Sequence, residues 1–84
     1  MTTVKEARYL KDYVIWIRFS DGVEGQIDLS SELEGEIFKP LKNLEYFRQF
    51  KLDDDLVTLT WPNGADFAPE FLHDLVLPEA ERAA

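Results

Sequence analysis

Residues 13–29 have the sequence YVIWIRFSDGVEGQIDL, which contains the clearest strand pattern of the chain. Apolar side chains alternate with period two on both sides of Asp21-Gly22, which predicts two half-buried strands. Asp-Gly between two alternating runs is a strong hairpin signal, because glycine accommodates a positive φ. The side chains expected to face the core are Tyr13, Ile15, Ile17 and Phe19 on the first strand, and Val23, Gly25, Ile27 and Leu29 on the second.

Further strands are predicted on both sides of this hairpin. Residues 4–10 form an edge strand. We expect Val4, Glu6, Arg8 and Leu10 on one side of it, and Lys5, Ala7 and Tyr9 on the other. Residues 50–52 and 56–61 form a second hairpin around the polar turn 53–55, and residues 65–67 form a short last strand.

Short helices are predicted in the middle of the chain and at its end. Ser31 with Glu34 fits a capping box, and Asn43 fits the N-cap of a helix through Arg48. Pro69 starts a helix over Pro69–Leu77 with one apolar stripe, and Pro78 ends it.

These elements predict one α+β domain over residues 1–84, ordered from about 3 to 77, with a frayed tail at 78–84. Its antiparallel sheet has five or six strands from two hairpins, with the helices packed on one face.

Charge is distributed unevenly along the 84 residues, whose formal net charge is −8. Residues 21–36 and 53–81 contain acids and no base, whereas residues 39–51 are mainly basic. This balance excludes a lone, sequence-independent nucleic-acid binder. It leaves two interpretations: a solvated surface that keeps the protein soluble, or an acidic face that steers a basic protein partner.

The sequence also gives expectations about where in the cell the protein is located. There is no cysteine, and no apolar run is long enough to span a bilayer or to form a signal peptide. We therefore expect a cytoplasmic protein with no disulfide and no membrane contact. The oligomeric state is left open.

The residues offer no catalytic arrangement. His73 is the only histidine, and it is expected to be a surface residue of a helix. The run Asp53-Asp54-Asp55 lacks the spacing of a calcium loop, and the four glycines form no phosphate-binding loop. The aromatic residues have too few bases near them for a nucleic-acid stacking surface and are expected in the core. We therefore expect no enzyme activity, no metal and no cofactor.

The most distinctive segment is Trp61-Pro62-Asn63-Gly64-Ala65-Asp66. Trp61 is expected to anchor the sheet, and Asn63-Gly64 to turn the chain. Asp66 has two alternative roles: it caps the turn or the Pro69 helix, or it belongs to a partner-binding surface. The candidate surface residues are therefore Trp61, Asn63, Gly64 and Asp66, together with Asp21 and Gly22 of the first turn.

Three segments together resemble the small bacterial family called domain of unknown function 2442. They are Ile17-Arg18-Phe19-Ser20-Asp21-Gly22, Asp28-Leu29 and Trp61-Pro62-Asn63-Gly64-Ala65-Asp66-Phe67-Ala68-Pro69-Glu70-Phe71-Leu72. Phe38, Leu41 and Phe47 also match the middle of that family's pattern, so the resemblance covers residues 4–76.

The resemblance implies a small α+β fold without established catalytic residues. Some members of the family lie beside toxin-like genes, which implies an antitoxin or accessory role. Others carry a C-terminal helix-turn-helix, for which a chain ending at Ala84 has no room. We therefore expect a non-enzymatic protein-interaction module. The alternative is a component of a DNA-associated transcriptional regulator that acts with a partner.

Overall fold

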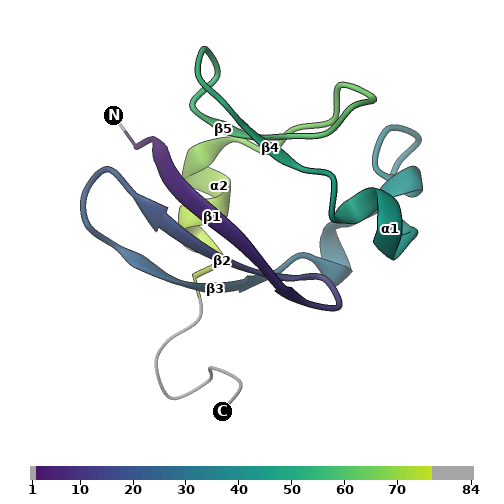
Figure 1. Ribbon diagram of the computed structural model, residues 1–84, viewed down its shortest axis with the longest axis horizontal. Helices are drawn as coiled ribbons and strands as arrows, with labels where there is room; N and C mark the ends of the chain where they lie inside the picture. Colours follow the sequence, from purple (N-terminus) through teal and green to yellow (C-terminus); the bar gives the residue numbers. More distant parts are fainter. Residues whose placement is uncertain (1, 77–84) are drawn as a thin grey trace.

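The first three strands form one antiparallel sheet in the computed structural model, which describes residues 2–76. Strands β1 (Val4–Lys11), β2 (Val14–Phe19) and β3 (Glu24–Asp28) lie in the order β1-β2-β3 (Figure 1). The predicted hairpin of β2 and β3 is confirmed, with Ile15 opposite Ile27 and Ile17 opposite Gly25. Met1 and residues 77–84 lie outside the described residues, and so do the predicted tail and the last residue of the predicted helix.

The core face of this hairpin follows the predicted alternation, with one exception. Ile15, Ile17, Phe19, Ile27 and Leu29 are at most 1% exposed. Val23 was expected to face inward, but it is 37% exposed because it lies in the turn before β3 begins.

Two register shifts in β1 change which of its side chains face the core. Val4 pairs with Phe19 and Glu6 with Arg18, so Lys5 is an extra residue on the β1 side. An extra residue reverses the alternation beyond it. Val4, Ala7 and Tyr9 therefore pack on the core, and the prediction that Val4 shares a face with Glu6 and Arg8 is wrong.

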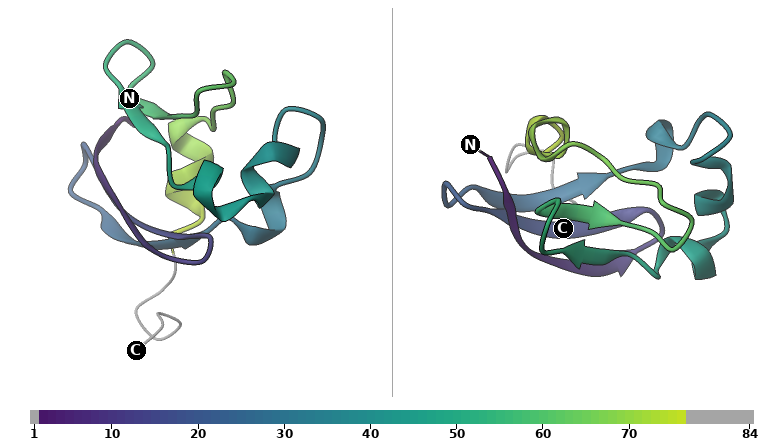
Figure 2. Two further views of the ribbon diagram at one scale, coloured as in Figure 1. Left: turned by 45° about the vertical axis from the view of Figure 1, so that its right-hand side comes forward. Right: turned by 90° about the horizontal axis from the view of Figure 1, so that it is seen from above.

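The second hairpin forms a sheet of its own, so the prediction of one sheet with five or six strands is wrong. Strands β4 (Lys51–Asp53) and β5 (Thr58–Thr60) are three residues each. They cross the core face of the first sheet (Figure 2). The Val4 N–H donates to the Val57 carbonyl at 2.9 Å, a contact between the two hairpins. Strands this short, next to a bulged β1 edge, do not extend the first sheet.

The predicted last strand at residues 65–67 is reduced to a single bridge between Thr60 and Asp66. The turn before β5 also has an unusual backbone conformation, because Val57 has a φ of 52°. A β-branched residue in the left-handed region is strained, and here its carbonyl accepts the hydrogen bond from β1.

The helices are short. They are the 3₁₀ turns η1 (Ser30–Glu32) and η2 (Lys39–Lys42), and the α-helices α1 (Leu44–Phe47) and α2 (Pro69–Asp74). Asn43 caps α1 as predicted, since its Oδ1 accepts from the Glu45 and Tyr46 N–H groups. The predicted capping box at Ser31 is wrong, because η1 has no side-chain cap and its first N–H bonds to Asp28.

The core lies between the two sheets and is closed by the helices. Both sheets and three of the helices supply buried apolar side chains to one cluster, for example Ile17 from β2, Leu59 from β5, Phe47 from α1 and Leu72 from α2. No helix within residues 2–76 is long and apolar enough to cross a membrane.

Candidate functional site

Trp61 joins the second hairpin to the end of α1. Its side chain is 3% exposed, and the indole N–H donates to the Phe47 carbonyl at 2.8 Å. The carbonyls in the last turn of a helix have no partner within that helix. Trp61 therefore packs the core and satisfies a buried acceptor at the same time, so its role is structural.

Asn63 and Gly64 form the turn and fasten a distant loop to it. The Asn63 Oδ1 accepts from the Ala65 N–H at 3.0 Å, and its Nδ2 donates to the Ile37 carbonyl at 2.8 Å. Gly64 has a φ of +89°, which a residue with a Cβ rarely adopts. Asn63 thus ties residues 36–38 to the turn, and Gly64 gives the turn its backbone shape.

Asp66 does not cap α2, so this predicted role is wrong. The N-cap of α2 is Ala68, and no side chain bonds to the helix N-terminus. The Asp66 side chain is exposed and makes no hydrogen bond or ion pair within residues 2–76.

Three phenylalanine rings meet at the place that this turn organises. Phe67 stacks on Phe38 with ring centroids 4.7 Å apart, and on Phe71 with centroids 5.7 Å apart. Phe67 is buried, whereas Phe71 is 38% exposed and the adjacent Ile37 is 46% exposed. We call Phe38, Phe67 and Phe71 the phenylalanine stack. It presents apolar surface to solvent from segments that are far apart in the sequence.

Carboxylates without a partner accompany the stack. Glu36 precedes Ile37, Asp66 precedes Phe67, Glu70 precedes Phe71, and Asp74 lies one helical turn beyond Glu70. We call these four residues the acidic rim. All four are exposed, and none bonds to another side chain within the described part of the chain.

Several acidic residues between positions 21 and 34 have a different role, because they already have partners. Asp28 binds the first N–H of η1, and Glu34 pairs with Lys42 at 3.5 Å. Asp21 accepts from the Val23 N–H at 3.0 Å, and its second oxygen lies 2.9 Å from His73 Nε2. The Val23 N–H, followed by His73, holds the pKa of the Asp21 carboxyl below its usual value.

The Asp21–His73 contact joins two segments 52 residues apart. His73 lies on α2 as predicted, and its ring meets Phe19 edge-on with centroids 4.8 Å apart. The first turn is therefore tied to α2, and Gly22, with a φ of +89°, shapes that turn. No hydrogen bond or ion pair within residues 2–76 connects Asp21 or Gly22 to the 61–66 turn.

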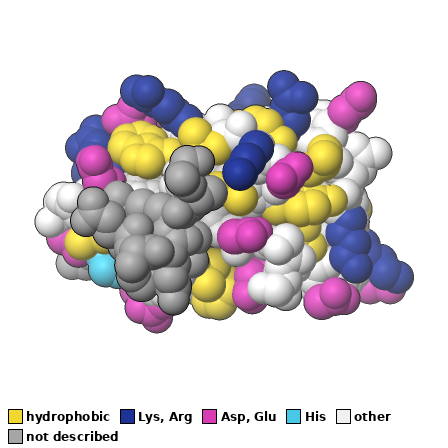
Figure 3. All heavy atoms as spheres, turned by 90° about the horizontal axis from the view of Figure 1, so that it is seen from below, with side chains coloured by type: hydrophobic (Ala, Val, Ile, Leu, Met, Phe, Trp, Pro, Cys, Tyr) yellow, Lys and Arg dark blue, Asp and Glu magenta, His cyan; other side chains and the backbone are white. Residues whose placement is uncertain are grey.

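Basic residues on the outer face of the three-stranded sheet are also paired. Glu6 accepts from Arg8 at 2.8 Å and from Arg18 at 2.9 Å. Arg18 and then Arg8 lower the pKa of the Glu6 carboxyl. Arg8 also lies over the Trp16 ring, 5.4 Å from its centroid. Seen from below, this side of the molecule mixes both signs of charge with apolar side chains and is not an acidic face (Figure 3).

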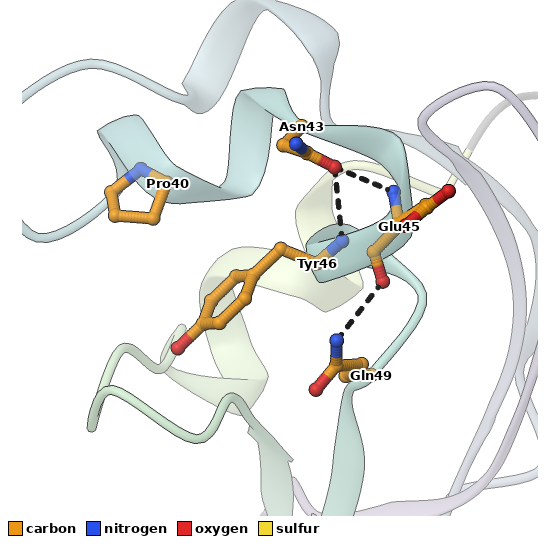
Figure 4. Close-up of a pocket in the computed structure, with 5 residues that line it drawn as sticks. All are labelled: Pro40, Asn43, Glu45, Tyr46 and Gln49. Carbon is orange, nitrogen blue, oxygen red and sulfur yellow. Dashed lines mark hydrogen bonds between the residues drawn. The ribbon is translucent and has the colours of Figure 1, made fainter.

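A shallow, open depression of about 380 Å³ lies beside α1. Pro40, Asn43, Glu45, Tyr46 and Gln49 line it (Figure 4). The Asn43 amide oxygen caps α1, and the Gln49 side chain donates to the Glu45 carbonyl at 3.3 Å. One polar atom of each of these two amides is therefore engaged within the helix. Within residues 2–76, no three His, Asp or Glu side chains are grouped to hold a metal ion.

A family model described as "Protein of unknown function (DUF2442)" matches residues 4–76. The chain belongs to this DUF2442 family. The resemblance carried by the Trp61–Asp66 segment is thus confirmed over the residues it was expected to cover. Comparisons of the chain with curated proteins and with solved structures find no match.

For this DUF2442 chain, the sequence located the 61–66 turn but not the surface that the turn builds. The phenylalanine stack was missed because its rings come from residues 38, 67 and 71, which belong to different elements. The matched middle segment with Phe38 was the one available signal. The Asp21–His73 contact could not be predicted from the sequence, because nothing in the residues around either side chain indicates that the two lie close together.

Proposed function

We propose that this DUF2442 protein is a non-enzymatic interaction module that binds a protein partner through the acidic rim. The observation that carries the proposal is that four carboxylates without a partner lie next to the segments of the phenylalanine stack, or one helical turn from them. The carboxylates of Asp21, Asp28 and Glu34 already have partners, whereas the four of the acidic rim have none within residues 2–76. Free carboxylates on the segments that also carry exposed apolar side chains favour a partner of positive charge.

The local chemistry supports binding more than catalysis. His73 is engaged with Asp21 and Phe19, and the depression beside α1 is shallow and lined by amides already in use. In the 61–66 turn, the Asn63 side chain positions residues 36–38, which is a structural role and not a catalytic one. We propose a cytoplasmic partner, and the neighbourhood of toxin-like genes in the family favours an antitoxin or accessory role.

The test is affinity capture from the native cell with the full chain, followed by binding kinetics of the identified partner. We expect an association rate that falls steeply between low and physiological salt, because exposed charges are screened over a Debye length of about 8 Å at 0.15 M. The variant that tests the rim is Asp66→Lys/Glu70→Lys. Its matched control is Asp54→Lys/Asp55→Lys, which changes the net charge by the same amount at the β4-β5 tip. The absence of a reproducible partner, or an association rate that does not depend on salt, contradicts the proposal.

A further inference from the structure

We infer that the phenylalanine stack and the acidic rim form one docking surface, and that its occupant is an amphipathic basic segment of the partner protein. Such a segment carries apolar side chains on one face and Lys or Arg beside them. This inference rests on the proposed function and deepens it by naming the site and the chemistry of the ligand.

The apolar half of the surface is built from rings that the described residues, 2–76, leave partly open to solvent. Phe67 is 7% exposed and supports the two rings stacked on it. Phe71 at 38% and Ile37 at 46% remain open to solvent, while Phe38 is half-buried. Rigid aromatic rings with a buried support are typical anchors of protein interfaces.

Hydrogen bonds hold the backbone segments that carry the three rings. Asn63 holds the Ile37 carbonyl, and the Thr58 hydroxyl donates to the Phe67 carbonyl at 2.6 Å. Pro69 starts α2 and so places Glu70 and Phe71 on its first turn. Each of the three segments that carry the rings is therefore held in place, and a preorganised surface loses less entropy on binding.

The charged half decides the occupant. Each ring segment brings a free carboxylate: Glu36 next to Ile37, Asp66 next to Phe67 and Glu70 next to Phe71. The chain segment with the complementary charge, residues 39–51, has two of its cations engaged within the molecule. Lys42 pairs with Glu34, and Arg48 lies 5.1 Å from the Tyr9 ring centroid. Lys39 and Lys51 have no such partner within residues 2–76, but a second copy brings the same net charge of −8, so we assign the surface to a basic partner.

The probe for the first experiment is a synthetic peptide of about 18 residues, designed as an amphipathic helix with Leu on one face and Lys on the other. The control peptide has Glu in place of Lys. Binding to the full chain is measured by fluorescence anisotropy, and the contact surface is mapped by amide chemical shifts. We expect saturable binding of the Lys peptide alone, with shifts concentrated in residues 36–38 and 66–74.

Matched variants then separate this surface from general electrostatics. Asp66→Lys/Glu70→Lys and Asp54→Lys/Asp55→Lys change the net charge equally, in the rim and at the β4-β5 tip. We expect the rim variant to weaken binding about tenfold or more and the tip variant less than about threefold. Phe71→Ala is compared with Leu56→Ala, a control at a side chain that is 51% exposed. We expect a loss of about fivefold or more from the first and no more than about twofold from the second.

Several results overturn the inference. They are equal binding of the Lys and Glu peptides, no binding of either, equal effects of the two double variants, or shifts centred on residues 39–51. Circular dichroism confirms that each variant is folded before its affinity is compared. A captured native partner that binds the rim variant more weakly than the tip variant, but binds Phe71→Ala as tightly as Leu56→Ala, overturns the docking surface and leaves the proposed function standing. Failure to capture any partner overturns the proposed function instead.

Discussion

Replacement of Trp61 by phenylalanine removes the indole N–H that bonds to the Phe47 carbonyl at 2.8 Å while keeping an aromatic ring in the core. Because Trp61 is 3% exposed and Phe47 is fully buried, water does not reach the carbonyl easily after the change. An unsatisfied buried acceptor costs about 1–3 kcal/mol. The smaller ring adds about 1 kcal/mol for lost packing. We therefore expect Trp61→Phe to lower the free energy of unfolding by about 3 kcal/mol.

In a domain of this size, about 3 kcal/mol corresponds to a fall of about 12–24 °C in Tm. The measurement is urea and thermal unfolding followed by far-ultraviolet circular dichroism, because tryptophan fluorescence changes with the substitution itself. Trp16→Phe is the matched control. Trp16 lies half-buried on the outer sheet face, where its ring contacts Arg8, so its loss costs less than about 1 kcal/mol.

Two results contradict this reasoning. One is a loss below about 0.5 kcal/mol for Trp61→Phe, which means that the Phe47 carbonyl finds another donor or reaches water. The other is an equal loss in the two variants, which means that ring size and not the hydrogen bond determines the effect.

Three further predictions concern the two turns of the candidate site. Asn63→Asp keeps the acceptor for the Ala65 N–H but loses the donor to the Ile37 carbonyl, so we expect a loss of about 1 kcal/mol and increased amide exchange at residues 36–38. Unchanged exchange there means that Asn63 does not hold the loop. Gly64→Ala is expected to cost about 1 kcal/mol in urea unfolding, because its φ of +89° strains a residue with a Cβ although nothing lies within 4 Å of that atom. A stability equal to that of the wild type rules out this conformational cost. The lowered pKa of Asp21 stabilises the fold above the unfolded value of 3.8, and this contribution is lost as the pH falls through the lower folded pKa. Asp21→Asn should therefore flatten the acid side of the stability–pH profile, and a slope equal to that of the wild type contradicts the role of Asp21.

Some carboxylates of the acidic runs form turns and are therefore unlike those of the acidic rim. Asp53, in the acidic run 53–55, accepts from the Asp55 and Leu56 N–H groups and so shapes the β4-β5 turn. A count of charges along the sequence cannot separate such local turn formers from the acidic rim, because the difference depends on which N–H groups the fold brings near each carboxylate.

Strand prediction succeeded where the pattern was local and failed where one residue changed the register. The β2-β3 hairpin follows from alternation and from Asp21-Gly22, because both signals act over a few residues. The core face of β1 did not follow, since the extra residue at Lys5 reverses the alternation without any change in composition. The division into two sheets depends on how a hairpin with strands of three residues meets the bulged edge of β1. That arrangement is a property of the assembled backbone.

The α+β class, the central hairpin, the Asn43 cap and membership of the DUF2442 family could all be predicted from the residues alone, because each depends on neighbouring residues or on a contiguous motif. The role of the Trp61–Asp66 segment could not, because it depends on tertiary contacts. The fold brings the Trp61 N–H to Phe47, Asn63 to Ile37 and Phe67 between two other rings, through contacts that span 14, 26 and 29 residues. Contacts over such distances are selected by the packing of one shared core, and so the surface that this segment builds becomes visible only in the fold.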